Sequence, residues 1–381
     1  TSLPDTDDVA APPFSRPCCR PCCLFVSLAA AGVMYTCSTA ARQSVPLAGL
    51  PGAATWLGGT AGPSPELLAP AAWDKYGVFR YLRGWTQDRF AACTFHPPPC
   101  PESAFATPAS GCSARGPLRR LLLTSDGLSS VRVQEAFRAM LRDAAEARGG
   151  ATSKRVLLIL DGAYAAYRDG LQFTAPYEYC AMRKEELGGL GASAVICIIL
   201  DPAARRQEWE AGQADPRRAA FGNAMLEIDD DYISSQLGSA TAVFVEVGSP
   251  IPLLAAMRRK LGPGGGAGPQ LSTAEAVRAR VLDGSGTLVY VGASSGSTIA
   301  GEDVGFLQDK SAGLLGGDLS GLRLVPNCTF MPHVTAGQAP WLRRVAVGSR
   351  VGMMGIPDCY PVVAAAGPSE PRRLGYLCAR G

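Results

Sequence analysis

The residues best suited to do chemistry begin with a serine in the last third of the chain. Ser294 stands in the segment Gly292-Ala293-Ser294-Ser295-Gly296, directly after an apolar run that ends at Val291. A Gly-x-Ser-x-Gly segment between a strand and a helix is the pattern of a nucleophile elbow, in which small neighbours let the backbone turn sharply beneath an exposed hydroxyl. The segment therefore predicts Ser294 as a nucleophile for acyl transfer.

A serine nucleophile needs a base, and the chain has only 2 histidines to supply one. The base is usually a histidine that a carboxylate holds in the right tautomer. His96 lies in the Pro-rich segment FHPPPCP, whereas His333 lies in TFMPHV, downstream of the elbow. We therefore expect His333 to be the base, the alternative being a packed or surface histidine near a turn.

The elements that must position these residues begin at about Pro117, where apolar strands alternate with amphipathic helices. This alternation predicts an α/β fold with a mostly parallel sheet flanked by helices. Apolar residues recur at steps of three and four and predict a helix from about Ser130 to Arg148. Buried strands are expected at Leu121–Thr124, Val156–Leu160, Ala194–Leu200, Ala242–Glu246 and Thr287–Val291.

Composition and charge exclude several classes of protein. The hydrophobic share of 47% with 18% charged residues is that of a globular chain and not of a disordered one. The net charge of +3 comes without a sustained basic run, which argues against a nucleic-acid partner.

Most of the 13 cysteines precede residue 113, and the five that follow show no metal-ligand spacing. Cys197 lies in an apolar run, where we expect a small buried side chain. A reducing compartment fits this part of the chain best, and no metal or cofactor is expected.

Residues 1–116 differ in character from the rest and form a low-complexity region rich in Pro, Ala and Cys. The apolar stretch from Leu24 to Tyr35 is too short to span a bilayer, which takes about 20 residues. It suits a signal-peptide core, and its arginine flanks suit an organellar presequence. We expect either a targeting segment or an extension here, followed by one domain over residues 117–381, in the cytoplasm or an organelle.

From about Leu118 to Gly381 the chain resembles the peptidase E and cyanophycinase family of serine peptidases (peptidase family S51). The segments that carry the resemblance appear in the family's order: LLLTSDGLSS, VLLILDGAY, ATAVFVEVGSPIPLLAAMR, VYVGASSGSTIAG, LRLVPNCTFMPHV and GIPDCYPVVAAAG. The resemblance implies a three-layer, flavodoxin-like fold of the class I glutamine amidotransferase type. It also implies Ser294 as nucleophile, His333 as base and then acid, and Asp358 as the carboxylate that orients His333.

Further site residues follow from the resemblance. Gly248 and Ser295 would supply the backbone N–H groups of an oxyanion hole. Asp309 falls where the family has another acidic residue near the site, and it is equally well read as a surface-loop acid. The implied substrate is a small peptide.

The chain departs from the family in the glycine-rich turn, which reads Glu246-Val247-Gly248-Ser249-Pro250 and keeps one glycine. Losing one oxyanion donor typically lowers turnover by about 100- to 1,000-fold. An impaired member of the fold that acts as a binding or scaffold module is therefore the alternative function. Glu246 would also disfavour an acidic substrate, and a structural role is open to it. No transmembrane segment is expected, and a homodimer is left open.

Overall fold

The fold is known from a computed structural model, which describes Cys93, Cys112 and residues 120–150, 153–171, 174–262, 270–305, 310–334, 352–365 and 373–376. All of these lie in Pro63–Gly381, the second of two units into which the chain divides. Predictions made for Leu24 to Tyr35 and for Asp309 concern residues outside the described ranges. The proposed domain boundary at residue 117 stays a prediction.

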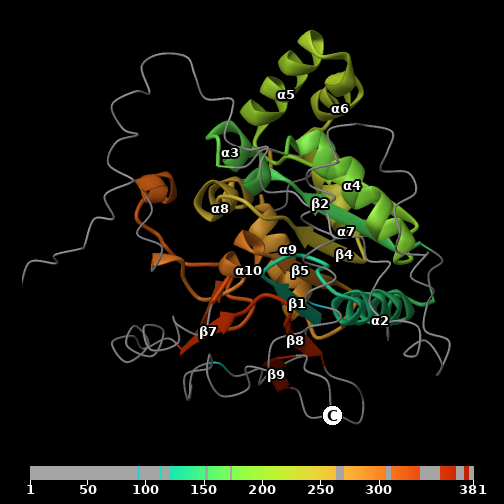
Figure 1. The fold of residues 1–381 in the computed structure, drawn as a ribbon, viewed down its shortest axis with the longest axis vertical. Coiled ribbons are helices and arrows are strands. Elements are labelled where there is room, and N and C mark those ends of the chain that lie inside the picture. The colour runs from blue at the N-terminus through green and yellow to red at the C-terminus, as the bar shows by residue number, and fades with distance from the viewer. Residues whose placement is uncertain are drawn as a thin grey trace, which may run out of the picture. The chain divides into compact units, whose positions relative to one another are not determined.

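A sheet of seven strands forms the centre of the described structure (Figure 1), in the order β3-β2-β4-β5-β1-β8-β9. The first five strands in that order are parallel, and β8 and β9 continue the sheet antiparallel. The strands are β1 (Arg120–Thr124), β2 (Arg155–Ile159), β3 (Ala194–Ile198), β4 (Ala242–Val245), β5 (Val289–Ala293), β8 (Val362–Ala365) and β9 (Arg373–Tyr376). A separate parallel pair joins β6 (Cys328–Pro332) to β7 (Gly352–Ile356). The α/β architecture with a mostly parallel sheet is as predicted.

Helices connect the parallel strands, as crossovers between parallel neighbours require. They are α2 (Val131–Ala147), α3 (Asp161–Arg168), α4 (Pro176–Gly189), α5 (Pro202–Ala214), α6 (Pro216–Leu226), α7 (Asp230–Ser239), α8 (Pro250–Arg258), α9 (Thr273–Leu282) and α10 (Ser295–Ile299), with a 3₁₀ turn at Lys310–Leu315. Helices α5 and α6 pack on each other as a hairpin at the top of Figure 1. None of the helices in the described ranges is long and apolar enough to cross a membrane.

The core forms where the central strands meet the helices. Strands β4 and β5 are buried along their whole lengths, as expected for parallel strands covered on both faces. Helix α2 buries Val133, Phe137 and Leu141 on one face, and Ser130 accepts a hydrogen bond from the N–H of Val133 to cap its start. The buried framework fixes the carboxyl ends of β1, β4 and β5 at the same edge of the sheet.

Candidate active site

Ser294 lies in the sharp turn between β5 and α10. Its backbone has φ 50° and ψ −104°, a strained conformation that is rare for a residue with a side chain. The two flanking glycines permit the turn, since a Cβ on Gly292 would lie 2.6 Å from the Gly296 carbonyl carbon and a Cβ on Gly296 would lie 2.3 Å from the Val245 oxygen. The Gly-x-Ser-x-Gly segment thus adopts the strand-turn-helix geometry predicted for it.

Strand β1 holds this turn in place. The N–H of Ser294 donates to the carbonyl oxygen of Thr124 over 2.9 Å. The buried hydroxyl of Ser297 accepts from the N–H of Thr124 at 3.0 Å, and Tyr290 donates its hydroxyl to the carbonyl of Gly296 at 2.7 Å. These buried hydrogen bonds offset the strain at Ser294 and keep its side chain at the edge of the sheet.

His333 follows β6 and faces Ser294. Its Nε2 lies 3.0 Å from the Oγ of Ser294. The backbone of His333 has φ 58° and donates its N–H to the Oγ of Ser125 at 2.9 Å. Ser125 in turn donates to the carbonyl of Ile356 at 2.6 Å, so one buried hydroxyl ties the ends of β1, β6 and β7 together.

Asp358 lies in the turn after β7 and contacts the other ring nitrogen. Its Oδ1 is 3.1 Å from the Nδ1 of His333. The structure therefore brings together Ser294, His333 and Asp358, in the order nucleophile, base and carboxylate that activates a serine. His333 and Asp358 are 46% and 42% exposed, so the pair is open to a ligand from solvent.

Asp126 is a neighbour of this site that the sequence analysis did not single out. Its Oδ1 lies 3.6 Å from the Nδ1 of His333, and its side chain is 5% exposed. With His333 and Asp358 it forms a group whose potential ligand atoms all lie within 4.8 Å of one another. The Nδ1 of His333 and the Oδ1 of Asp358 are already at a hydrogen-bond distance of 3.1 Å. We therefore interpret the group as two carboxylates around one imidazole.

Gly248 lies in the turn between β4 and α8 that the resemblance assigns to an oxyanion hole. Its φ is 129°, and a Cβ at this position would lie 2.0 Å from the carbonyl oxygen of Gly162, so only glycine fits. Pro250 begins helix α8, where an N–H would have no partner within the helix. The altered turn thus keeps the glycine that the geometry requires.

Ser295 is the first residue of α10, and its backbone N–H falls among those that a helix leaves without an internal acceptor. Its hydroxyl donates to the carbonyl of Glu246 at 2.8 Å, which joins the elbow to the Gly248 turn. One hydrogen bond therefore connects Ser295 to the strand end that leads into Gly248.

Glu246 does not face a ligand. Its side chain is 0% exposed and forms a buried ion pair with Arg183, and its Oε2 accepts the N–H of Val247 at 3.1 Å. Because the carboxylate is buried and paired with Arg183, its position gives no support to the expectation that this acid disfavours acidic substrates. The structural role left open for it fits its position.

Asp161, at the start of α3, is a buried acid close to the same turn. It accepts the backbone N–H groups of Leu200 and Asp201 at 2.8 and 3.0 Å. Burial raises its pKa to about 6 despite these hydrogen bonds. The next residue, Gly162, accepts the N–H of Ser249 at 3.0 Å, so Asp161 belongs to the support of the candidate oxyanion turn.

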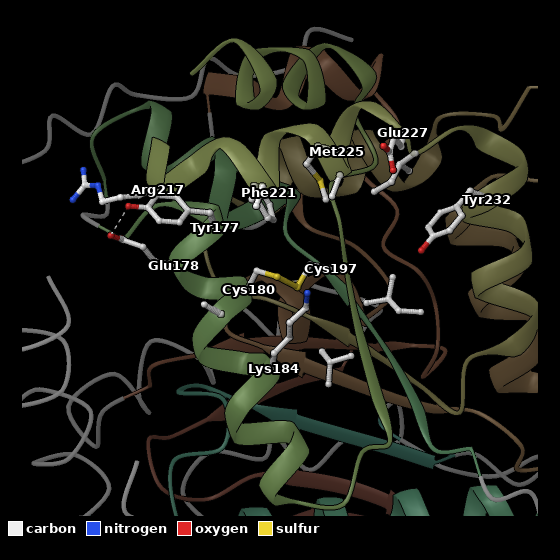
Figure 2. Close-up of a pocket in the computed structure, with 16 residues that line it drawn as sticks. Tyr177, Glu178, Cys180, Lys184, Cys197, Arg217, Phe221, Met225, Glu227 and Tyr232 are labelled. Carbon is white, nitrogen blue, oxygen red and sulfur yellow. Dashed lines mark hydrogen bonds between the residues drawn. A yellow bond between two sulfur atoms is a disulfide. The ribbon is translucent and has the colours of Figure 1, made fainter. Parts of the chain in front are cut away.

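A cavity of about 720 Å³ lies elsewhere, against α4, α6, α7 and β3 (Figure 2). Lys184 and Tyr232 line it, and no residue of the triad does. The residues of the triad and this cavity are therefore separate features of the structure.

Disulfides add to what was expected of the cysteines, since Cys197 is buried as predicted but is also bonded to a second cysteine. Cys180 in α4 bonds to Cys197 in β3, and Figure 2 shows this bond in the wall of the cavity. Cys93 bonds to Cys359 and Cys112 bonds to Cys328. Spacing could not reveal pairs that lie 216 and 266 residues apart, and the reducing compartment expected for this part of the chain does not agree with the disulfides among the described residues.

The fold and site define an α/β protein with a serine, a histidine and an aspartate in contact at the carboxyl edge of its sheet. No family model matches the chain, and no curated protein matches it. Among solved structures, it is similar to a putative peptidase E from Listeria monocytogenes EGD-e, with 15% identity over 67% of this chain and 99% of that one and a TM-score of 0.37. A peptidase from an acI-B1 Actinobacterium matches with 11% identity over 66% of this chain and 85% of that one and a TM-score of 0.43.

Proposed function

We propose that the protein is a serine-type peptidase or amidase that hydrolyses small peptides through an acyl-enzyme at Ser294. The observation that carries the proposal is the hydrogen-bonded chain from Ser294 Oγ to His333 Nε2, at 3.0 Å, and from His333 Nδ1 to Asp358, at 3.1 Å. The strained φ of 50° at Ser294 supports it, because an ordinary surface serine does not need such a backbone.

The first half of the reaction forms the acyl-enzyme. Ser294 Oγ attacks the carbonyl carbon of the substrate while its proton passes to Nε2 of His333, and Asp358 stabilises the imidazolium through Nδ1–H. The backbone N–H groups of Gly248 and Ser295 stabilise the negative charge on the carbonyl oxygen. The C–N bond then breaks, and the leaving amine takes the proton from Nε2.

Water completes the second half. His333 takes a proton from a water molecule, whose oxygen attacks the acyl carbon. The ester bond to Ser294 breaks, the acid product leaves, and the serine recovers its proton from His333. Each proton that His333 accepts is returned, so the enzyme ends in its starting state and no cofactor is consumed.

The same geometry bears on the alternative of a catalytically impaired scaffold. That alternative rested on the altered glycine turn, and the positive φ of Gly248 together with the placement of Pro250 at a helix start supports a turn able to present an N–H group. The buried position of Glu246 removes the argument that this acid disfavours an acidic substrate. We therefore propose a small peptide without naming its side chains.

Labelling with a fluorophosphonate probe tests the proposal. The wild-type protein should label stoichiometrically, Ser294→Ala should not label, and His333→Ala should label far more slowly. Ser234→Ala, which alters an exposed serine of α7, is the matched control and should label like the wild type. With a peptide substrate from a library screen, Ser294→Ala should lower kcat by roughly 10⁶-fold. A folded wild-type protein that neither labels nor cleaves would favour the scaffold alternative.

A further inference from the structure

Two carboxylates, and not one, surround the Nδ1 of His333. Asp358 lies at 3.1 Å on the turn after β7, and Asp126 lies at 3.6 Å on the loop after β1. A serine triad needs one carboxylate at this nitrogen. The presence of Asp126, the second carboxylate, therefore has to be explained by its effect on His333.

The two carboxylates differ in how far solvent screens them. The side chain of Asp358 is 42% exposed and that of Asp126 is 5% exposed. Two charges interact more strongly through the protein interior than through water, because the interior has a lower dielectric constant. Asp126 can therefore influence the charge on His333 strongly even at the longer distance.

The backbone holds Asp126 in this position. Its neighbour Ser125 is bonded to the N–H of His333 and to the carbonyl of Ile356. The next residue, Gly127, has φ 70°, and a Cβ there would lie 2.8 Å from a guanidinium nitrogen of Arg183. The loop is thus fixed on one side by the histidine segment and on the other by a buried cation.

The charged groups around Asp126 can be named from each element that packs there. His333 follows β6, Asp358 follows β7, and Arg183 lies on α4 behind Gly127. Arg183 is itself bonded to Glu246 and Glu186. The two glutamates therefore already balance its positive charge.

We propose that Asp126 is a positioning residue that acts through His333, holding the Nδ1–H in place together with Asp358 and stabilising the imidazolium. The proposal deepens the proposed function and rests on it for its catalytic meaning. The proton from Ser294 moves only to Nε2, the Nδ1–H proton stays on His333, and Asp126 remains a carboxylate throughout. Asp126 also provides a reserve acceptor when Asp358 is lost.

The chain allows a test that does not depend on activity, because it contains only 2 histidines. In a His96→Gln background the imidazole N–H signals in an NMR spectrum belong to His333 alone. A hydrogen bond from an N–H group to a carboxylate is shorter and stronger than one to a neutral acceptor, so the Nδ1–H signal reports on the carboxylates around it. Asp126→Asn should therefore shift the Nδ1–H proton signal of His333, and Asp231→Asn, an exposed acid of α7, should leave that signal unchanged.

Kinetics in the wild-type background give the second readout. In a triad with a single carboxylate, an Asn substitution lowers kcat by about 10⁴-fold. If Asp126 shares the role, Asp358→Asn should cost only about 10- to 100-fold, and Asp126→Asn in that background should remove most of the remaining activity. In Asp126→Asn alone, kcat should fall while KM changes little, because the substitution acts through His333 and not through substrate binding.

The outcomes separate this inference from the proposed function. An unchanged Nδ1–H signal of His333 in a folded Asp126→Asn protein, judged by its melting temperature and circular dichroism, would overturn the inference. A shifted Nδ1–H signal in a protein whose wild type neither labels nor hydrolyses would keep the carboxylate pair and overturn the peptidase proposal. Full loss of activity in Asp358→Asn alone would also count against a reserve role for Asp126.

Discussion

Arg183 and Glu246 form an ion pair that is buried beneath the candidate oxyanion turn. Arg183 comes from α4, Glu246 directly follows β4, and their side chains are 10% and 0% exposed. The arginine also contacts the ring of Phe244 and bonds to Glu186. The pair therefore fastens helix α4 to the end of the strand that leads into Gly248.

Loss of this ion pair is expected to destabilise the fold. Glu246→Gln leaves the Arg183 charge buried with one acid fewer, and breaking a buried pair from one side typically costs about 3–5 kcal/mol. The free energy of unfolding, measured by urea denaturation, should fall by about that amount. Glu227→Gln, an exposed acid of the same charge, is the control. A change in substrate preference without loss of stability would instead return Glu246 to the substrate site.

The hydroxyl of Ser125 is expected to matter for catalysis through His333. Ser125→Ala removes the acceptor for the His333 N–H and leaves the Ile356 carbonyl without that donor, at a cost of about 1–3 kcal/mol for buried groups. Because His333 would lose its fixed backbone, kcat should fall while KM changes little. Steady-state kinetics on the folded variant check this. An equal rise in KM with kcat unchanged would mean that Ser125 serves substrate binding instead.

Asp161 is expected to make stability depend on pH. Its folded pKa of about 6 exceeds the unfolded value of 3.8, so the native state binds more protons between these values and stability falls as pH rises through them. The shift corresponds to about 3 kcal/mol. Denaturation from pH 4 to pH 7 should therefore show Asp161→Asn gaining on the wild type by about that amount, while Asp231→Asn should show no such trend. Parallel curves for Asp161→Asn and wild type would contradict the assignment.

The disulfide between Cys180 and Cys197 is expected to stabilise the edge of the sheet. It closes a loop with a sequence separation of 17 residues, for which the loss of chain entropy in the unfolded state predicts about 3 kcal/mol. A Cys180→Ala/Cys197→Ala variant should unfold at correspondingly lower urea concentration. Reductant should destabilise this variant less than the wild type, because one bond is already absent. No difference between the two proteins in the absence of reductant would show that these thiols are not joined in solution.

The parts of the fold that were predictable share one property, a local pattern. The apolar runs for β1 to β5 and the helix periodicity of α2 depend only on neighbouring residues, and the structure places these elements within about two residues of the expected bounds. Strand β7 reads GMMGI and has no β-branched residue before Ile356, so its composition gave little sign of a strand. In the candidate site, too, the residues marked by a local pattern were predictable and the others were not.

Ser294 and His333 were visible through the elbow motif and the scarcity of histidine, and Asp358 through resemblance. Asp126 was not visible, because it lies 207 positions before His333 in the sequence (333 − 126) and meets it only in the folded chain, and no spacing rule encodes such a contact. The buried partner of Glu246 was hidden for the same reason. An acid next to a glycine turn reads as a ligand contact until Arg183 is seen behind it.

The two disulfides that reach back to Cys93 and Cys112 bear on how the chain could be processed. A cut near residue 117, where the composition changes, would leave both cysteines on the upstream piece. Their partners, Cys359 and Cys328, remain with the body of the protein. Cleavage would thus yield a two-chain protein that stays covalently whole, separates on a gel only after reduction, and differs in intact mass from the uncut chain by a single water.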